Sequence, residues 1–239
     1  MIAIILAGGR GERLRPITHY LPKVLLPIGT KPLLDFILDR LRLYGFSEIF
    51  VAVSDFYDLV DRYVKVSGYD DVKPVRVLGW ETGGDLLLAL EGVNAIGDVL
   101  VWNGDTLIDL DLSVLLRDHE SLGTLVTLTG VLVPSHEALR KKGVITLENG
   151  RVSMLIEKPL ELSVDTVLVN GGVYVLDSRF VEERGEFLSP RKCSLEEEVF
   201  PRLIQRRELG ASLAHCSYLV DVGLPEDYVK AFLRFSQTQ

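Results

Sequence analysis

Leu6–Pro27 reads LAGGRGERLRPITHYLPKVLLP and directly follows a short apolar run, Ile2–Leu6. Glycines and arginines are interleaved near its start, and a lysine follows on the same segment: Gly8, Gly9, Gly11, Arg10, Arg13, Arg15 and Lys23. Glycine lets a backbone turn tightly and approach a ligand closely, because it has no Cβ. Exposed N–H groups beside guanidinium and ammonium groups predict a cradle for a polyphosphate.

Two familiar nucleotide-binding motifs do not match this loop. Glu12 and Arg13 stand where the dinucleotide fingerprint needs small residues, and no Gly-Lys-Ser or Gly-Lys-Thr follows as in a P-loop. The structural alternative is a tight strand-to-loop turn with solvated arginines. Lys23, which lies between Pro22 and Val24 on the same segment, favours phosphate binding over that alternative.

The first 105 residues alternate between short apolar runs and segments of helical periodicity. We expect strands at Ile2–Leu6, Glu48–Val53, Val75–Leu78 and Asp98–Trp102, and helices at Pro32–Tyr44, Asp55–Val64 and Gly83–Leu90. Continuous apolar strands separated by helices are typical of a parallel sheet that is covered on both faces. The sequence therefore predicts an α/β fold with a Rossmann-like open, mainly parallel sheet and helices on both faces.

After Asp105 the pattern becomes rich in strands. We expect strands at Thr124–Val133, Gly143–Leu147, Arg151–Ile156, Thr166–Leu176 and Ser212–Val220, and helices at Glu196–Arg206 and Pro225–Phe235. Asn149-Gly150 predicts a hairpin turn, and Asn170-Gly171-Gly172 interrupts an otherwise good strand. No linker or repeat separates this part, so we expect residues 1–239 to form one domain with a β-rich extension.

Composition limits the class of protein. The chain has 239 residues, 47% of them hydrophobic and 25% charged, and a net charge of −8. That charge argues against a nucleic-acid partner or an anionic membrane surface. Cys193 and Cys216 lack zinc-ligand spacing, and the apolar start is too short for a signal peptide, so we expect a cytoplasmic protein. Few Asn and Gln residues with abundant Glu and Arg favour a heat-adapted source.

Several charged or amide side chains follow expected strands, where open α/β sheets bind ligands. Asp105 and Asp221 have the hard oxygen donors that Mg²⁺ prefers, although Asp105 could instead cap a turn. Lys158, beside Pro159, could bind a second phosphate or form a surface pair with Glu157. Asn170 could bind hydroxyls. We interpret the run Arg140-Lys141-Lys142 as solvated surface.

Together these pieces resemble the sugar-1-phosphate nucleotidylyltransferases, also called nucleotide-sugar pyrophosphorylases, from Ile2 to about Tyr228. The pieces occur in the family's order: LAGGRGERLRPIT, PKVLLPIGTKP, ETGG (Glu81–Gly84), NGD (Asn103–Asp105), Gly143, EKP (Glu157–Pro159), NGGVY (from Asn170), SLEEEVFP (from Ser194) and DVGLPEDY (from Asp221). In motif the chain is most similar to mannose and heptose 1-phosphate guanylyltransferases and N-acetylmuramate 1-phosphate uridylyltransferases.

The resemblance implies a role for each matching position. Catalytic roles fall on Arg13, Lys23 and Asp105, and nucleotide binding on Leu6, Gly8, Gly9, Gly11, Glu81 and Gly84. Sugar-phosphate binding falls on Gly143, Glu157, Lys158 and Asn170, and Mg²⁺ binding on Asp105 and Asp221. Residues 1–110 would be the nucleotide-binding half and 111–239 the sugar-binding half, without the left-handed β-helix domain of bifunctional relatives. The resemblance also allows a homo-oligomer, which the sequence does not decide.

The implied reaction is an in-line attack of a sugar 1-phosphate oxygen on the α-phosphorus of an NTP, with pyrophosphate leaving. A non-catalytic sugar-nucleotide-binding relative is the alternative, and its expected sign, loss of Arg13, Lys23, Asp105 or Asp221, is absent. The chain departs from the family at Glu12, at Gly79-Trp80 and at Asp85. The base therefore stays open: Glu81 could accept hydrogen bonds from guanine or from uracil, and we slightly favour GTP with a mannose-like sugar over UTP or dTTP.

Overall fold

The first half of the chain forms the parallel sheet that the sequence predicts. The computed structural model describes residues 1–236. Four parallel strands lie in the order β5-β4-β1-β6, with β1 (Ile2–Leu6) in the interior between β4 (Ile49–Val53) and β6 (Val99–Asn103). The edge strand β5 spans Val72–Arg76, so our range of Val75–Leu78 is wrong at both ends. Its Pro74 is tolerated because an edge strand can lack one N–H donor.

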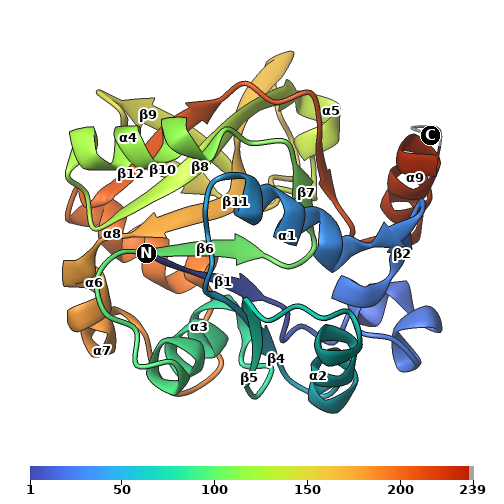
Figure 1. Cartoon of the computed structure of the whole chain (residues 1–239). Coiled ribbons are helices and arrows are strands. Elements are labelled where there is room, and N and C mark those ends of the chain that lie inside the picture. Colours follow the sequence, from blue (N-terminus) through green and yellow to red (C-terminus); the bar gives the residue numbers. More distant parts are fainter. Residues whose placement is uncertain (237–239) are drawn as a thin grey trace.

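Helices cover both faces of this sheet, which confirms the predicted fold class (Figure 1). In β1, Ala3 and Ile5 face the hydrophobic cluster made with α1 (Leu33–Leu43), α2 (Tyr57–Val66) and α4 (Leu112–Leu122). Ile4 faces the opposite cluster, which includes residues of α3 (Glu81–Gly92). Alternate side chains of a strand point to opposite faces, so a continuous apolar strand is buried on both sides.

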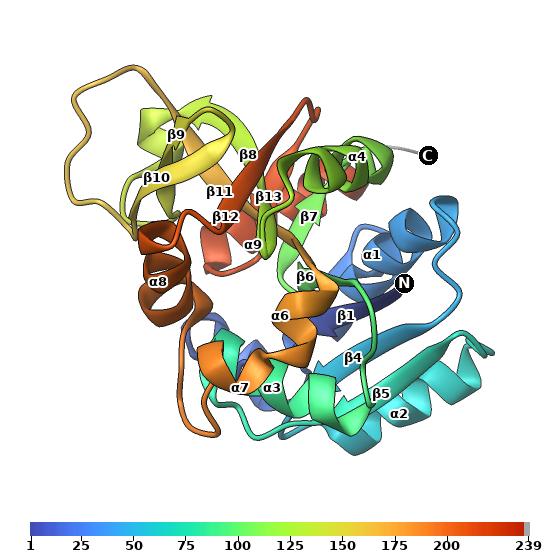
Figure 2. The same cartoon turned by 90° about the vertical axis from the view of Figure 1, so that its left-hand side faces the viewer.

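The second half extends the same sheet. The long strand β11 (Thr166–Leu176) pairs antiparallel with β6 on one side and with β8 (Val126–Pro134) on the other. The sheet then continues through β12 (Leu209–Ala214), β10 (Arg151–Ile156) and β9 (Val144–Glu148). Helix α4 packs against β12 and β8. In Figure 2, α6 (Ser178–Glu182), α7 (Arg184–Phe187) and α8 (Phe200–Gln205) lie below the strands of this extension. A short α5 (Ser135–Ala138) follows β8.

Two turn predictions are confirmed. Asn149 and Gly150, with φ of 52° and 75°, join β9 to β10 as a hairpin. The pairing of β11 with β8 shifts register between Asn170 and Tyr174, and Gly172 in that bulge has a φ of 74°. The bulge turns the strand where it passes the carboxyl end of β6.

Our single strand over Ser212–Val220 is wrong. Residues 209–214 form β12 in the large sheet, whereas Leu219–Asp221 form β13 in a separate two-stranded sheet. The chain turns at Ser217, whose N–H donates to Asp109 Oδ1 over 2.8 Å. We also missed the partner of β13, the short strand β7 (Thr106–Ile108), because three residues give little periodicity.

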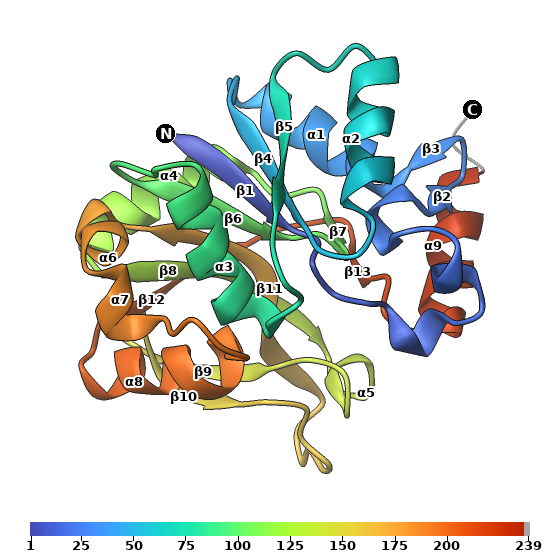
Figure 3. The ribbon, with the colours of Figure 1, turned by 90° about the horizontal axis from the view of Figure 1, so that it is seen from below.

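A third hydrophobic cluster joins the glycine-rich segment to the end of the chain. Leu14 and Leu26 from that segment pack with Leu107 of β7, Val222 and Ala231. Ala231 belongs to α9 (Pro225–Ser236), which lies beside β2 (Pro27–Ile28) and β3 (Lys31–Pro32) in Figure 3. Leu14–Lys31 otherwise contains only short 3-10 turns. No helix within residues 1–236 combines the length and the apolar character that crossing a membrane would require.

Candidate active site

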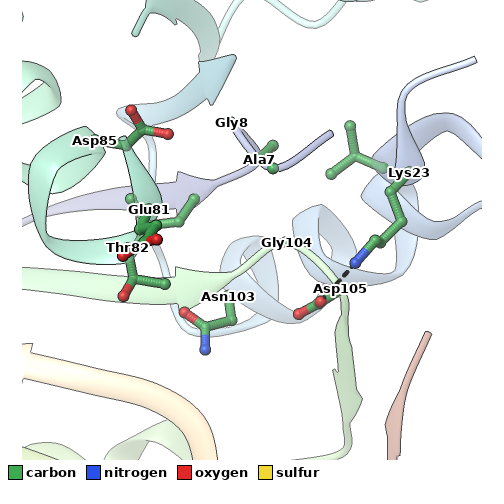
Figure 4. Close-up of a pocket in the computed structure, with 12 residues that line it drawn as sticks. Ala7, Gly8, Lys23, Glu81, Thr82, Asp85, Asn103, Gly104 and Asp105 are labelled. Atoms are coloured by element: carbon green, nitrogen blue, oxygen red, sulfur yellow. Dashed lines mark hydrogen bonds and ion pairs between the residues drawn. The ribbon is translucent and has the colours of Figure 1, made fainter. Parts of the chain in front are cut away.

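A cavity of about 200 Å³ opens where β1 and β6 end (Figure 4). Its lining includes four of the predicted nucleotide-binding residues, Leu6, Gly8, Gly9 and Glu81, and two of the predicted catalytic residues, Lys23 and Asp105. The carboxyl ends of parallel strands are where open α/β sheets bind ligands. A wider pocket of about 420 Å³ shares Glu81, Thr82, Asn103 and Asp105 with it. The two pockets together form one continuous cleft.

Gly8 lies against a buried carboxylate. A Cβ on Gly8 would lie 2.0 Å from Asp85 Oδ2, so no larger residue fits without movement. Asp85 is only 3% exposed, and its Oδ1 accepts from the N–H of Trp80 over 2.8 Å. Burial raises the pKa of Asp85, and hydrogen bonds from the backbone of residues 78–80 partly offset that rise. Asp85 therefore holds the 78–80 segment beside the glycine-rich loop.

Lys23 and Asp105 form an ion pair at the floor of the cleft, with 2.8 Å between Nζ and Oδ2 (Figure 4). Burial acts to raise the pKa of Asp105, but Lys23 and Arg13 more than offset it, so the pKa lies below 3.8. Asp105 is therefore ionised at neutral pH. Arg13 lines the wider pocket beside Gly223.

Asp221 is brought to the same pocket by the pairing of β13 with β7. Asp221 pairs with Thr106 in register, and the N–H of Val222 donates to the carbonyl of Asp105 over 2.8 Å. Thr106 Oγ1 donates to Asp221 Oδ1 over 3.0 Å, and Lys142 Nζ donates to Asp221 Oδ2. Our interpretation of Lys142 as solvated surface is wrong, because its side chain is only 9% exposed.

The four predicted sugar-phosphate residues line the wider pocket together. They are Gly143, Glu157, Lys158 and Asn170. Backbone bonds join them: the N–H of Asn170 donates to the carbonyl of Gly143 over 2.9 Å. Glu157 Oε1 lies 2.9 Å from Lys158 Nζ. Burial raises the pKa of Glu157, with Glu196 and Glu197 adding to the rise and Lys158 opposing it.

Sequence reasoning missed a buried hydrogen-bond network between the two pockets. The hydroxyl of Tyr174, which is fully buried, accepts from Asn103 and Asn170 over 3.1 and 3.0 Å and donates to Glu196 Oε1 over 3.2 Å. Glu196 Oε2 accepts from Thr82 over 2.9 Å. In the sequence, the apolar strand pattern around Tyr174 indicated only that this residue is buried. Glu196 is the first of three consecutive glutamates, and nothing distinguished it from the other two.

Two predicted nucleotide-binding glycines lie outside the lining of both pockets. A Cβ on Gly84 would meet the carbonyl of Arg191 at 2.3 Å, so Gly84 packs helix α3 against that loop. Gly11 has a φ of 61°, and its carbonyl accepts from Thr18 Oγ1 over 2.8 Å, so it shapes the glycine-rich loop. Glu81 lines both pockets and has a φ of 63°, a left-handed conformation that residues other than glycine adopt uncommonly.

Asp105 and Asp221 are two of the carboxylates that line the wider pocket, and the β7–β13 pairing brings them together. Within residues 1–236, no group of three or more His, Cys, Asp or Glu side chains is arranged to hold a metal ion. Mg²⁺ in nucleotide enzymes is bound by one or two carboxylates, with phosphate oxygens and water completing its shell. The donor set therefore fits Mg²⁺ that arrives with a phosphate ligand rather than a metal caged by protein alone.

The sequence model of a family described as Nucleotidyl transferase matches residues 2–238. The chain belongs to this family. Among curated relatives, it is 29% identical to D-glycero-alpha-D-manno-heptose 1-phosphate guanylyltransferase of Campylobacter jejuni, over 95% of this chain and 97% of that one. It is also 29% identical to UTP–glucose-1-phosphate uridylyltransferase of Synechocystis, over 97% of this chain and 62% of the relative.

Solved structures agree with the family assignment. HddC from Yersinia pseudotuberculosis, complexed with GMP-PN, superposes with a TM-score of 0.76 at 26% identity and covers 98% of both chains. Mannose-1-phosphate guanyltransferase of Schizosaccharomyces pombe is 31% identical over 96% of this chain and 62% of its own length. The chain thus spans less than two thirds of several curated family members it matches.

The neighbouring glycines of the loop give a matched pair of substitutions. We expect Gly8→Ala to lower the free energy of unfolding by about 1–3 kcal/mol, because the new Cβ would overlap Asp85 Oδ2. A Cβ on Gly9 meets nothing within 4 Å, so Gly9→Ala should change stability by less than about 0.5 kcal/mol. Urea denaturation of the three proteins measures this difference. Equal losses from the two substitutions would contradict the close approach of Asp85 to Gly8.

Burial and Lys23 shift the pKa of Asp105 in opposite directions, and replacing Lys23 separates the two effects. In Lys23→Met, the neighbouring ammonium no longer opposes the effect of burial, so the pKa of Asp105 should rise above its wild-type value, as followed by NMR of its side-chain carboxyl carbon. In the wild type the folded pKa is lowered, so ionised Asp105 contributes stability that is complete above pH 3.8 and is lost as pH falls through the folded pKa. An unchanged pKa in Lys23→Met would show that Lys23 does not stabilise the carboxylate.

Proposed function

We propose that this protein transfers a nucleoside monophosphate from an NTP to a sugar 1-phosphate, giving an NDP-sugar and pyrophosphate. The observation that carries the proposal is the continuous cleft, in which the glycine-rich loop, two carboxylates and the EKP segment face a common space. Curated relatives named for guanylyl and uridylyl transfer to sugar 1-phosphates support the same reaction.

On the nucleotide side, Gly8 and Gly9 would receive the base and ribose, since they line the narrower cavity. Arg13 would bind the β- and γ-phosphates, and Lys23 would bind the α-phosphate as charge develops on it. Phosphoryl transfer needs positioning and cations rather than a covalent nucleophile. Gly11 would shape the loop. Gly84 would pack α3 against the segment that contains Arg191 rather than contact the base.

On the acceptor side, Glu157 and Asn170 would bind sugar hydroxyls and Lys158 the phosphate, with Gly143 leaving room for the ring. A Cβ on Gly143 would lie 2.7 Å from Glu157 Oε2, so a side chain there would compete with the carboxylate for space. A phosphate oxygen of the acceptor attacks the α-phosphorus, and the bond to pyrophosphate breaks on the opposite side.

Members of this family generally depend on a metal ion, and we propose that it is Mg²⁺ held by Asp105 and Asp221. When bound, Mg²⁺ would act as a Lewis acid and offset the negative charge that develops during transfer. The residues around it have separate tasks: Thr106 orients Asp221, and Lys23 keeps Asp105 ionised.

We further propose GTP as the nucleotide and a mannose- or heptose-like 1-phosphate as the acceptor. Guanine presents two N–H donors, at N1 and N2, and Glu81 offers a carboxylate acceptor in the narrower cavity. The relative that this chain covers almost end to end is named as a heptose 1-phosphate guanylyltransferase. We also propose that the protein is cytoplasmic and has no nucleic-acid partner. We propose further that its nucleotide half and its sugar half divide at about residue 110.

Pyrophosphate release in the presence of Mg²⁺ tests the function directly. The panel pairs GTP, UTP, dTTP and ATP with mannose, heptose, glucose and N-acetylmuramate 1-phosphates. We expect turnover, with GTP and a manno-configured acceptor giving the highest kcat/KM. Asp105→Ala should reduce the rate at least about 100-fold at saturating substrates, because a charge-stabilising group is lost from the reacting phosphate.

Circular dichroism of Asp105→Ala provides the control for folding. Nucleotide binding without turnover for every pair would instead favour a non-catalytic sugar-nucleotide-binding protein. A higher kcat/KM with UTP or dTTP would overturn the proposed base while leaving the reaction class intact.

A further inference from the structure

Each carboxylate of the proposed metal site has its own lysine. Lys23 pairs with Asp105, and Lys142 donates to Asp221 Oδ2. The two pairs leave the ligand-free site balanced, with two negative and two positive side chains. Lys142 is 9% exposed at its side chain and contributes to both the wider pocket and the adjoining groove. Neither the resemblance nor the proposed function so far gives it a task.

A divalent cation and the ammonium of Lys142 cannot share Asp221 Oδ2 without strong repulsion. Like charges a few ångströms apart in a partly buried site repel strongly, since solvent screens them little. Thr106 occupies the other oxygen, Oδ1, through a hydrogen bond of 3.0 Å. Metal binding at Asp221 Oδ2 therefore requires Lys142 to leave.

The backbone around Lys142 directs where its side chain can go. Its carbonyl accepts from the N–H of Lys158 over 3.2 Å, and the next carbonyl, of Gly143, accepts from the N–H of Asn170. Lys142 is therefore anchored next to the proposed acceptor site at one end, while its ammonium reaches the metal site at the other. Lys141 differs, because its ammonium pairs with Asp227 of α9 over 2.8 Å.

We propose that Lys142 is a place-holder cation that occupies Asp221 in the ligand-free protein and moves to the phosphate of the acceptor when the metal binds. The second half of this statement rests on the proposed function; the first half does not. The exchange would couple metal binding to acceptor binding, because each metal ion that enters frees a cation for the sugar phosphate. A flexible lysine suits this task, since its compact charge can change partner.

The first arm of the test is Mn²⁺ binding to the ligand-free protein, measured by electron paramagnetic resonance. Removing the competing ammonium should tighten Mn²⁺ binding about three- to tenfold in Lys142→Gln, because a like charge is removed from the site. Lys142→Arg keeps the charge and should bind Mn²⁺ within about twofold of the wild type. Lys65→Gln removes a lysine–aspartate pair of 2.7 Å on the surface of α2 and should leave Mn²⁺ binding unchanged.

The Mn²⁺-binding measurement can also contradict the proposal. If Lys142 only braces Asp221, Lys142→Gln would weaken Mn²⁺ binding or leave it unchanged, and either outcome would overturn the proposal. Asp221→Asn should abolish the measured binding, and Mn²⁺ binding that survives this substitution would also overturn it. If Lys142→Gln does not fold, Lys142→Met, which removes the charge and keeps an apolar side chain of similar length, provides the same test and should also tighten Mn²⁺ binding.

The second arm is steady-state kinetics with the best substrate pair of the panel. Lys142→Gln should raise the KM for the sugar 1-phosphate about tenfold, the loss expected for one charge-assisted hydrogen bond, with little change in the KM for the nucleotide. An unchanged acceptor KM would overturn the transfer to the acceptor. If the wild type turns over no pair, the proposed function fails, whereas tighter Mn²⁺ binding by Lys142→Gln would still support the place-holder.

Discussion

Two three-residue strands, β7 and β13, hold the cleft together. They join segments more than 100 residues apart in sequence and set Thr106 opposite Asp221, while the N–H of Val222 bonds the carbonyl of Asp105. So small a sheet is not stable by itself. The cluster around Leu107 and Val222, to which the glycine-rich segment and α9 contribute, buries its apolar side. The spacing of the two carboxylates therefore depends on packing that also fixes the loop beneath Arg13 and Lys23.

Three lysines of the ligand-free cleft are held by carboxylates of the cleft itself. Lys23, Lys142 and Lys158 each contact a carboxylate, namely Asp105, Asp221 and Glu157. This arrangement gives a protein of net charge −8 a local concentration of positive charge at the cleft. Two of the carboxylates that hold these lysines, Asp105 and Asp221, are those proposed as ligands for the cation. Glu81 and Lys158, with φ of 63° and 47°, place backbone strain at the same cleft.

The parts predicted from the sequence are those with a local signal. Apolar strands that end in polar residues predicted that Asn103 and Asp105 lie at the carboxyl end of a strand. Asn149-Gly150 predicted the hairpin between β9 and β10. The parts that were missed depend on partners distant in sequence. Nothing near Lys142 indicates that Asp221 buries its ammonium, and nothing near Tyr174 indicates that two asparagines and Glu196 converge on its hydroxyl. The single strand predicted over residues 212–220 was wrong because this stretch contributes to two sheets, with β12 in the large sheet and β13 in the small one.

The shared cation site is tested most directly by anomalous diffraction from crystals grown with Mn²⁺ and a non-hydrolysable NTP analogue. We expect one strong peak in the cleft, within coordination distance of carboxylate oxygens of both Asp105 and Asp221 and of the nucleotide phosphates. A peak bound by phosphates alone, or one that contacts neither aspartate, would contradict the proposal that Asp105 and Asp221 hold the metal together.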